Sequence, residues 1–381
     1  MINITDSSKC CGCSACVNIC PVKCIVMHRD GEGFDYPVAD ISSCISCGKC
    51  DDVCPMLSSV TSSVMNAYAL RIPEYESEST SGGVFPALAA QVLEQGGVVT
   101  GAAFDSKLHL SHIIVNDKAG LSKLRGSKYV QSEIGGTYAQ TRDLLESGVK
   151  VLFSGTPCQI AGLLKCLHKP YANLLTVDVA CHGVPSPGIW EKYVQDSVVT
   201  GVEFRDKSGS WKRYKVAYSH SGLVKKSSVS RDPYMMSYLR NMNIRPSCYD
   251  CNFRAGSHYS DITLGDFWNV SNACPKMDDG KGVSAVLVNT AKGQQAIDSL
   301  KQSFEGIHIQ NIEYAEATSN NGGFLKKIDI PAGRKEFFAG FEHSKDIRAY
   351  IKKHVELKSC LRDLYDRFHT YMSLIKRRVL S

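Results

Sequence analysis

The sequence lacks several features that would point to other classes of protein. No apolar run approaches the roughly 18 residues that a membrane-spanning helix needs, and residues 1–6 have neither the basic nor the apolar region of a signal peptide. A basic stripe with interleaved aromatic residues, which is typical of nucleic-acid binding, is also missing. We therefore expect a cytoplasmic protein that has no transmembrane segment and binds no nucleic acid.

Two common nucleotide-binding motifs are absent as well. No G-x-G-x-x-G follows a predicted strand, and no G-x4-G-K-[ST] occurs in the 381 residues. The composition is otherwise that of an ordinary globular protein, with 43% hydrophobic and 22% charged residues, and the length suffices for two or three domains. Any dinucleotide site must therefore be built from other elements.

Cysteine is the residue that the sequence has in abundance, with 17 in the chain. Without an export signal, an odd number of cysteines indicates metal ligation rather than disulfides. Eight of them form two runs that each read C-x2-C-x2-C-x3-C-P, the spacing that holds [4Fe-4S] clusters in bacterial ferredoxins. The first run is Cys10, Cys13, Cys16 and Cys20 with Pro21, and the second is Cys44, Cys47, Cys50 and Cys54 with Pro55.

The same spacing predicts which cysteines share a cluster, because the fourth cysteine of each run ligates the cluster of the other run. Zinc knuckles, the main alternative, pair two C-x2-C hooks and need no third cysteine at the same step. Cys11 and Cys24 lie off this register, and we expect them to be spare buried thiols. The predicted ligands are Cys10, Cys13, Cys16 and Cys54 for cluster 1, and Cys44, Cys47, Cys50 and Cys20 for cluster 2.

The hydrophobic pattern divides the chain into regions. Residues 1–57 are expected to form a ferredoxin domain with a hairpin between its two runs, and a small polar linker follows. Helical and strand patterns then alternate, which is typical of an α/β sheet, whereas residues 202–229 alternate with period two and predict antiparallel strands. We expect a mixed α/β or α+β fold, in which a bacterial-type dicluster ferredoxin module precedes a larger α/β flavin-binding domain with parts at 66–150 and 151–340.

The expected helices span residues 84–95, 138–147, 158–167, 187–198 and 291–304, and the expected strands span 98–104, 150–153, 174–180 and 283–289. Residues 345–381 place apolar side chains largely on one helical face, with lysines and arginines opposite. This pattern predicts a basic amphipathic helix that docks on its own domain or on a partner subunit. A helix that lies on a membrane surface is the alternative.

A second group of four cysteines lies in glycine- and proline-rich surroundings: Cys158, Cys181, Cys248 and Cys251. Two of them, Cys158 and Cys181, follow predicted strand ends, where open α/β sheets bind ligands. A third [4Fe-4S] cluster, a zinc ion, or two separate sites would all fit this spacing.

Longer stretches of sequence carry a resemblance to a known family. They are SGGVF at 81–85, RGSKYVQS at 125–132, SGTPCQ at 154–159, CHGVPSP at 181–187, RPSCYDC at 245–251 and SDITLGDFW at 260–268. Together they resemble the coenzyme F420 hydrogenase/dehydrogenase beta-subunit family, in the form with an N-terminal two-cluster ferredoxin. The resemblance implies an iron–sulfur flavoprotein that binds FAD, and it implies a third [4Fe-4S] cluster at the second group of cysteines.

The sequence departs from this family at one place. Related sequences often carry an arginine shortly before Ser260-Asp261, where this chain has His258 and Tyr259. Any anion contact that this arginine makes in relatives is therefore not expected here.

Candidate FAD-binding residues are Ser81, Gly82, Gly83, Lys128, Gly155 and Thr156. The glycines precede a helix whose free N–H groups could hold a pyrophosphate, and the lysine could supply a countercharge. A plain helix start, a solvated surface lysine and a strand-to-helix turn explain the same residues. His182 is a candidate proton donor to a reduced flavin or hydrogen-bond donor to a cluster sulfur, or else a structural histidine.

These expectations combine into a function. Iron–sulfur clusters carry single electrons and hydride carriers deliver two, so a flavin belongs between them. We expect an oxidoreductase that passes electrons between a reduced carrier (F420H2, ferredoxin or similar), FAD and clusters, with a redox partner protein or reduced coenzyme. The sequence leaves homo-oligomerisation open. The alternatives are a non-enzymatic electron-transfer subunit that docks to a partner reductase, and a reductase of a sugar or lipid-linked intermediate.

Overall fold

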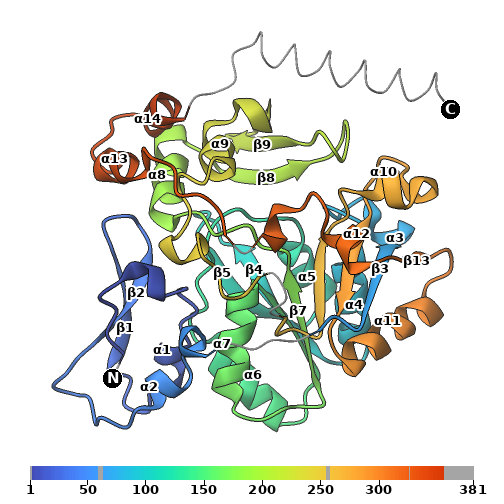
Figure 1. Cartoon of the computed structure of the whole chain (residues 1–381), viewed down its shortest axis with the longest axis horizontal. Coiled ribbons are helices and arrows are strands. Elements are labelled where there is room, and N and C mark those ends of the chain that lie inside the picture. Colours follow the sequence, from blue (N-terminus) through green and yellow to red (C-terminus); the bar gives the residue numbers. More distant parts are fainter. Residues whose placement is uncertain (1, 59–62, 255–257, 326, 356–381) are drawn as a thin grey trace.

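The structure is a computed structural model, and it describes residues 2–58, 63–254, 258–325 and 327–355. An eight-stranded sheet occupies the centre of the molecule (Figure 1). The cysteine-rich N-terminal module lies at one side of this sheet, and a three-stranded sheet lies above the large sheet in this view. Helices and strands alternate along much of the chain. The expected mixed α/β fold with a ferredoxin module is confirmed.

The large sheet has the strand order β13-β3-β12-β11-β7-β6-β4-β5. Strands β4, β6, β7 and β11 are parallel, and β5 and β12 are antiparallel to their neighbours. The carboxyl ends of the parallel strands therefore meet at one edge of the sheet, where loops can assemble a site. The strands are β3 (Asn66–Arg71), β4 (Val98–Phe104), β5 (Leu110–Val115), β6 (Val151–Gly155), β7 (Leu174–Val179), β11 (Ile262–Asp266), β12 (Ser284–Val288) and β13 (His308–Asn311).

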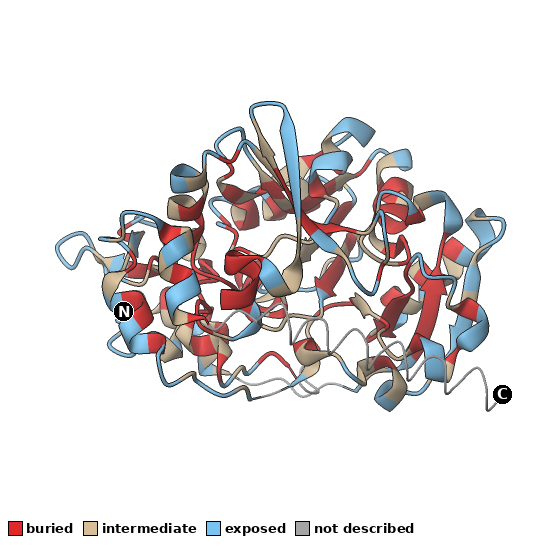
Figure 2. Ribbon diagram, turned by 90° about the horizontal axis from the view of Figure 1, so that it is seen from above, coloured by how far each residue is buried: buried red, intermediate tan, exposed pale blue. Residues whose placement is uncertain are grey.

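Helices cover both faces of this sheet. On β6, Leu152 packs with α4 (Val84–Glu94), α5 (Lys118–Leu124) and α11 (Ala291–Ser303), whereas its neighbours Val151 and Phe153 pack with α6 (Thr137–Glu146) and α7 (Pro157–Leu167). Successive side chains of a strand point to opposite faces, so the continuous apolar run is buried on both sides. Figure 2 shows these buried strands between the helices.

The N-terminal module packs against α6 and α7. It contains α1 (Ala15–Ile19), α2 (Lys49–Asp52) and the expected hairpin of β1 (Ile25–Arg29) and β2 (Asp35–Ala39). Asn18 Nδ2 donates to the Gly135 carbonyl at 2.9 Å. Gly162 of α7 admits the module closely, because a Cβ there would lie 3.0 Å from Cys13 Sγ. The module and the larger domain are therefore held by tight, specific packing.

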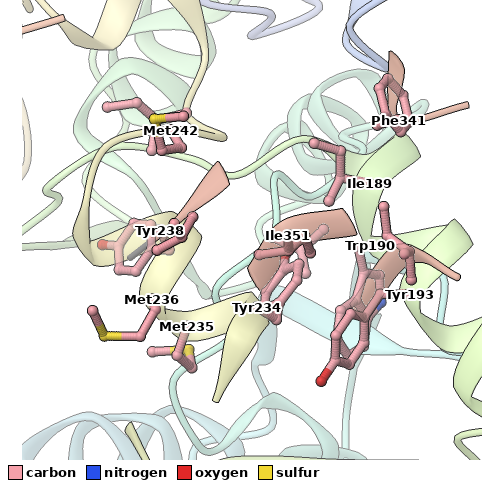
Figure 3. Close-up of a cluster of buried hydrophobic side chains, with 14 of the residues drawn as sticks. Ile189, Trp190, Tyr193, Tyr234, Met235, Met236, Tyr238, Met242, Phe341 and Ile351 are labelled. Atoms are coloured by element: carbon pink, nitrogen blue, oxygen red, sulfur yellow. The ribbon is translucent and has the colours of Figure 1, made fainter. Parts of the chain in front are cut away.

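The antiparallel strands expected within 202–229 form a separate sheet of β8 (Gly201–Asp206), β9 (Lys215–His220) and β10 (Leu223–Ser228). Its aromatic core includes Trp190 and Tyr193 of α8 (Pro187–Ser197) and Tyr234 of α9 (Pro233–Leu239) (Figure 3). Phe34 and Tyr36 of the ferredoxin hairpin belong to the same core. This core therefore also ties the hairpin to the rest of the molecule.

The remaining helices are short. They are α3 (Pro73–Glu76), α10 (Val270–Ala273), α12 (Tyr314–Thr318), α13 (Arg334–Gly340) and α14 (Ile347–His354). Of the expected C-terminal helix, α14 packs on α8 and α9, and residues 356–381 lie outside the described residues. Within the part of the chain that is described, no helix has the length and apolar character to cross a membrane.

Asp178 is a buried acid on β7, in the middle of the large sheet. Burial raises its pKa from the ordinary 3.8 to about 7, although contacts with Thr263 and Ser260 oppose the shift. The folded protein therefore keeps this proton up to about pH 7, while the unfolded chain loses it near pH 4. Between these values the folded state binds more protons, so this carboxyl lowers the free energy of unfolding as pH rises.

We expect Asp178→Asn to gain stability relative to the parent protein as pH rises from 5 to 7.5, by at most about 1.4 kcal/mol per pH unit. The substitution removes the titrating group and nearly preserves its shape. The measurement is the difference in thermal midpoint between the two proteins at each pH, under anaerobic conditions. A difference that stays constant with pH would show that Asp178 is ionised in the folded protein.

Candidate functional site

The two cysteine runs of the module adopt the same backbone conformation. Gly12 and Ser14 of the first run have φ of 69° and 59°, and Ser46 and Gly48 of the second have φ of 55° and 75°. In both runs these residues stand two and four positions after the first cysteine. Left-handed residues are rare outside glycine, so their recurrence at the same offsets indicates that each run makes the same tight turn.

Each run faces a hollow, and the fourth cysteine of the other run completes its lining. The cluster 1 hollow has about 350 Å³ of empty space and the cluster 2 hollow about 340 Å³, part of it open to solvent. Their cysteines are Cys10, Cys11, Cys13, Cys16 and Cys54 for the first, and Cys20, Cys24, Cys44, Cys47 and Cys50 for the second. The structure thus brings each predicted ligand set together, including the exchanged Cys54 and Cys20.

The second group of cysteines also surrounds one hollow, here called the third hollow, of about 410 Å³. Cys158 lies at the start of α7, just past β6, and Cys181 follows β7. Cys248 and Cys251 come from the loop after α9. All four thiols line this hollow. Among the described residues, no three His, Cys, Asp or Glu side chains converge closely enough to hold a single metal ion.

Arg254 forms part of the wall of the third hollow. It is 5% exposed, and its guanidinium donates to the carbonyls of His182, at 2.7 Å, and Cys248. These bonds join the two loops that carry Cys181 and Cys248. A fixed positive charge beside the four thiols also favours an anionic ligand there.

Cys11 connects two of these sites. It was expected to be a spare buried thiol, and it is indeed buried, but it lines both the cluster 1 hollow and the third hollow. Interaction with Cys11 and burial together hold the pKa of the Cys158 thiol well above its ordinary value. The two hollows are therefore neighbours, and their linings share Cys11 and Met56. Cysteine spacing alone does not indicate this, because Cys11 and Cys158 are far apart in the sequence.

Burial favours the protonated form of several of these thiols. Burial raises the pKa of Cys16 and of Cys248 to about 12. Metals and iron–sulfur clusters bind thiolates, so loading these sites must release protons.

The residues predicted to bind FAD lie at the carboxyl edge of the large sheet. Ser81 and Gly82 bond to the start of β12, through Val283 O at 2.9 Å and Ser284 Oγ at 3.0 Å. A Cβ at Gly82 would lie 2.3 Å from a main-chain oxygen of β3, so packing already requires glycine there. Gly83, with φ of 83°, begins α4. These glycines thus have structural roles whether or not they contact a ligand.

Lys128 lies close to this glycine loop, because Ser127 Oγ bonds to Thr80 Oγ1 at 3.4 Å. Its ammonium group is half-buried and donates to three main-chain carbonyls of its own loop, those of Leu124, Arg125 and Gly126. Burial lowers its pKa to about 7. The lysine therefore orders the loop at residues 124–128, and its role as a countercharge remains a prediction.

Gly155, Thr156 and His182 lie next to the third hollow. Thr156 caps α7 together with Gln159, and its Oγ1 lies 3.2 Å from Cys158 Sγ. His182 Nε2 lies 2.6 Å from Asn241 Oδ1, and its ring packs edge-on against Tyr238, with 5.7 Å between the ring centres. Any flavin near these residues would be close to the cysteine group.

An aromatic and charged group that sequence reasoning missed lies at the same edge of the sheet. Arg205 is buried, pairs with Asp266 at the end of β11, and stacks on the rings of Tyr214 at 4.3 Å and Trp268 at 5.2 Å. Its Nε and Nη2 atoms have no hydrogen-bond partner among the described residues. The signal that could have found it is the SDITLGDFW stretch, which contains both Asp266 and Trp268.

His258 and Tyr259 precede Ser260-Asp261, the place where the sequence departs from the family that it resembles. The histidine is buried, its pKa is lowered by burial, and its ring packs edge-on against Tyr314. The lowered pKa favours the neutral form of His258, which packs here against an aromatic ring.

Comparisons with known proteins agree with the two regions of the chain. Residues 148–313 match the family model for the C-terminal part of the coenzyme F420 hydrogenase/dehydrogenase beta subunit, and residues 9–57 match the 4Fe-4S dicluster domain. No curated protein matches the chain. Among solved structures, it is similar to a chain of the xenon-derivatized F420-reducing [NiFe] hydrogenase complex from Methanosarcina barkeri, with 16% identity and a TM-score of 0.47. That similarity covers 78% of this chain and 90% of the other.

Cysteine substitutions at the third hollow can distinguish cluster ligands from cysteines that only line the hollow. We expect Cys251→Ser to lose about four irons per chain, because a cubane needs its four ligands. Cys11→Ser is the matched control, since Cys11 lines the same hollow but is not a predicted ligand, and it should keep its iron. Iron and sulfide are measured after anaerobic purification. Loss of iron in Cys11→Ser but not in Cys251→Ser would mean that the ligand set is wrong.

Proposed function

We propose that this chain, whose residues 148–313 match the C-terminal model of the coenzyme F420 hydrogenase/dehydrogenase beta-subunit family and whose residues 9–57 match a 4Fe-4S dicluster domain, is an iron–sulfur flavoprotein oxidoreductase. It would pass electrons between a reduced carrier (F420H2, ferredoxin or similar), FAD and [4Fe-4S] clusters. Its family and its dicluster domain identify it as an iron–sulfur protein of the oxidoreductase class. The flavin, the third cluster and the carrier belong to the proposal.

One observation carries the proposal most strongly: of the three cysteine-lined hollows, two share Cys11. Cys11 lines both the cluster 1 hollow and the third hollow, so the two hollows are adjacent. Clusters bound in these hollows would form a continuous path for single electrons. A chain built only to store metal has no need of such contact.

The flavin is proposed at the carboxyl edge of the sheet, beside Cys158 and Cys181. A bound flavin accepts two electrons as a hydride and releases them singly, which is the chemistry that clusters lack. The residues available there are the glycine loop at 81–83, the turn at 155–156 and buried Arg205, whose unbonded N–H groups suit an anionic group. His182, held by Asn241 at 2.6 Å, is positioned to hold or deliver a proton.

A redox partner protein is proposed to bind at the cluster 2 hollow. Cys47 is the exposed cysteine of that hollow, and the neighbouring Ile41 and Ile45 are 74% and 61% exposed. Exposed apolar side chains around an accessible thiol are typical of a surface that binds another protein. Electrons would enter or leave the protein at this end.

Anaerobic purification with cofactor analysis tests the proposal. We expect about twelve irons, about twelve sulfides and one FAD per chain if three cubanes and a flavin are bound. Clusters without flavin would contradict an oxidoreductase and support a non-enzymatic electron-transfer subunit. About eight irons would contradict the third cluster, and zinc in place of iron would contradict the whole assignment.

A further inference from the structure

Arg245 is a fully buried arginine that contacts both regions of the protein. It comes from the loop between α9 and Cys248, and its main chain bonds to Val184 O at 3.0 Å. Its guanidinium reaches into the N-terminal module. Nε donates to Cys10 O at 2.7 Å, Nη2 donates to Asp35 O at 3.0 Å, and Nη2 lies 3.7 Å from Cys10 Sγ.

The remaining contacts of the guanidinium are uncharged. Nη1 donates to Gln131 Oε1 at 3.0 Å, and the guanidinium carbon lies 4.1 Å from the centre of the Tyr36 ring. Within the described residues Arg245 forms no ion pair with a carboxylate. Burial raises the pKa of Asp30, and the charge of Arg245 opposes this rise. The carboxyl group of Asp30 already accepts hydrogen bonds from the main-chain N–H groups of Glu32 and Phe34. A buried charge without a counterion is costly, so this cation needs an anion that is not among its side-chain contacts.

The cysteine hollows lie where such an anion would be. Cys10, which Arg245 contacts through sulfur, lines the cluster 1 hollow, and Cys248, whose N–H donates to Arg245 O at 2.9 Å, lines the third hollow. Gln131, the partner of Arg245, also donates to Cys11 O at 3.1 Å, and Cys11 lines both hollows. A [4Fe-4S] cluster with four thiolates carries a net charge of about −2, so it would supply the missing negative charge.

We propose that Arg245 is the shared countercharge of the two clusters at the cluster 1 and third hollows, and that it sets their reduction potentials close together. The inference rests on the proposed function, because it requires clusters in both hollows. Arg245 is a positioning residue in this role. It holds the segment Cys10–Cys11 between the two sites, with its guanidinium at Cys10 and its main-chain carbonyl bonded to Cys248.

The electrostatic consequence has a definite sign. Each cluster takes up one electron on reduction, supplied by the flavin or by an external reductant, and its net charge becomes more negative by one. A nearby cation stabilises the reduced form more than the oxidised form, so Arg245 raises the reduction potential. The cluster 2 hollow, which Arg245 does not contact, should be affected least.

Two variants test this inference. Arg245→Gln removes the charge, and Gln131→Glu places a carboxylate beside it while the side chain keeps its shape and touches no cysteine sulfur. We expect both to lower the potentials of two of the three one-electron steps, measured by redox titration with electron paramagnetic resonance. The ratio of reduced to oxidised cluster at fixed potential should fall at least about tenfold, which is about 59 mV for a one-electron couple. The third step should stay unchanged.

Arg29→Gln is the matched control, because it makes the same change of charge on the ferredoxin hairpin at a residue paired with Asp35 and Glu191. It should shift no step, and Arg245→Lys, which keeps a positive charge, should recover most of the loss. If Arg245→Gln does not retain its iron, Gln131→Glu decides. Unchanged potentials, or an equal shift of all three steps, in a protein with about twelve irons would overturn the inference. A parent protein without these clusters would instead overturn the proposed function.

Discussion

The segment from Cys10 to Cys13 is the constraint on which the arrangement of sites depends. It lines the cluster 1 hollow, reaches the third hollow through Cys11, and packs on α7 at Gly162. Gly12 at its centre has φ of 69°, and a Cβ there would lie 2.8 Å from Arg245 Nη1. The close approach of the Gln131 and Arg245 side chains favours glycine there, whereas Ser46 adopts the equivalent positive φ in the second run. One short loop therefore fixes the position of the N-terminal module relative to the larger domain.

Charge and burial explain why this loop needs more than packing. Arg245 and Arg254 are both buried near the cysteines, and they bond mainly to main-chain carbonyls. Carbonyl oxygens satisfy the N–H groups of Arg245 but do not neutralise its charge. Burial raises the pKa of Cys248 and of Cys181 in the same region, which favours their neutral thiols. Cluster binding would convert these thiols to thiolates and compensate the charge of Arg245, so folding of the region and cofactor loading should be coupled.

Much of this organisation is local and could be predicted from sequence. The two cysteine runs, the hairpin, the α/β alternation and the antiparallel sheet each depend on spacing or periodicity within a few residues. The strands β3 and β11 were not expected, because short segments such as Ile262–Asp266 carry no periodicity that separates them from loops. Cys11 and Arg245 could not be found in this way either. Their roles depend on contacts with α7 and with the N-terminal module, more than 100 residues away in the sequence.

The topology explains how these distant residues come to one place. The chain leaves the sheet at the end of β7 and returns at β11, the neighbouring parallel strand. The excursion between Val179 and Ile262 supplies Cys181, Cys248 and Cys251, both buried arginines beside them, and Arg205. A connection between two adjacent parallel strands leaves the sheet at its carboxyl edge and returns at its amino edge. The first residues after β7 therefore lie at the carboxyl edge. The fourth cysteine of the third hollow, Cys158, follows β6 at the same edge of the sheet. The proposed flavin site shares this edge, because β3 also ends there.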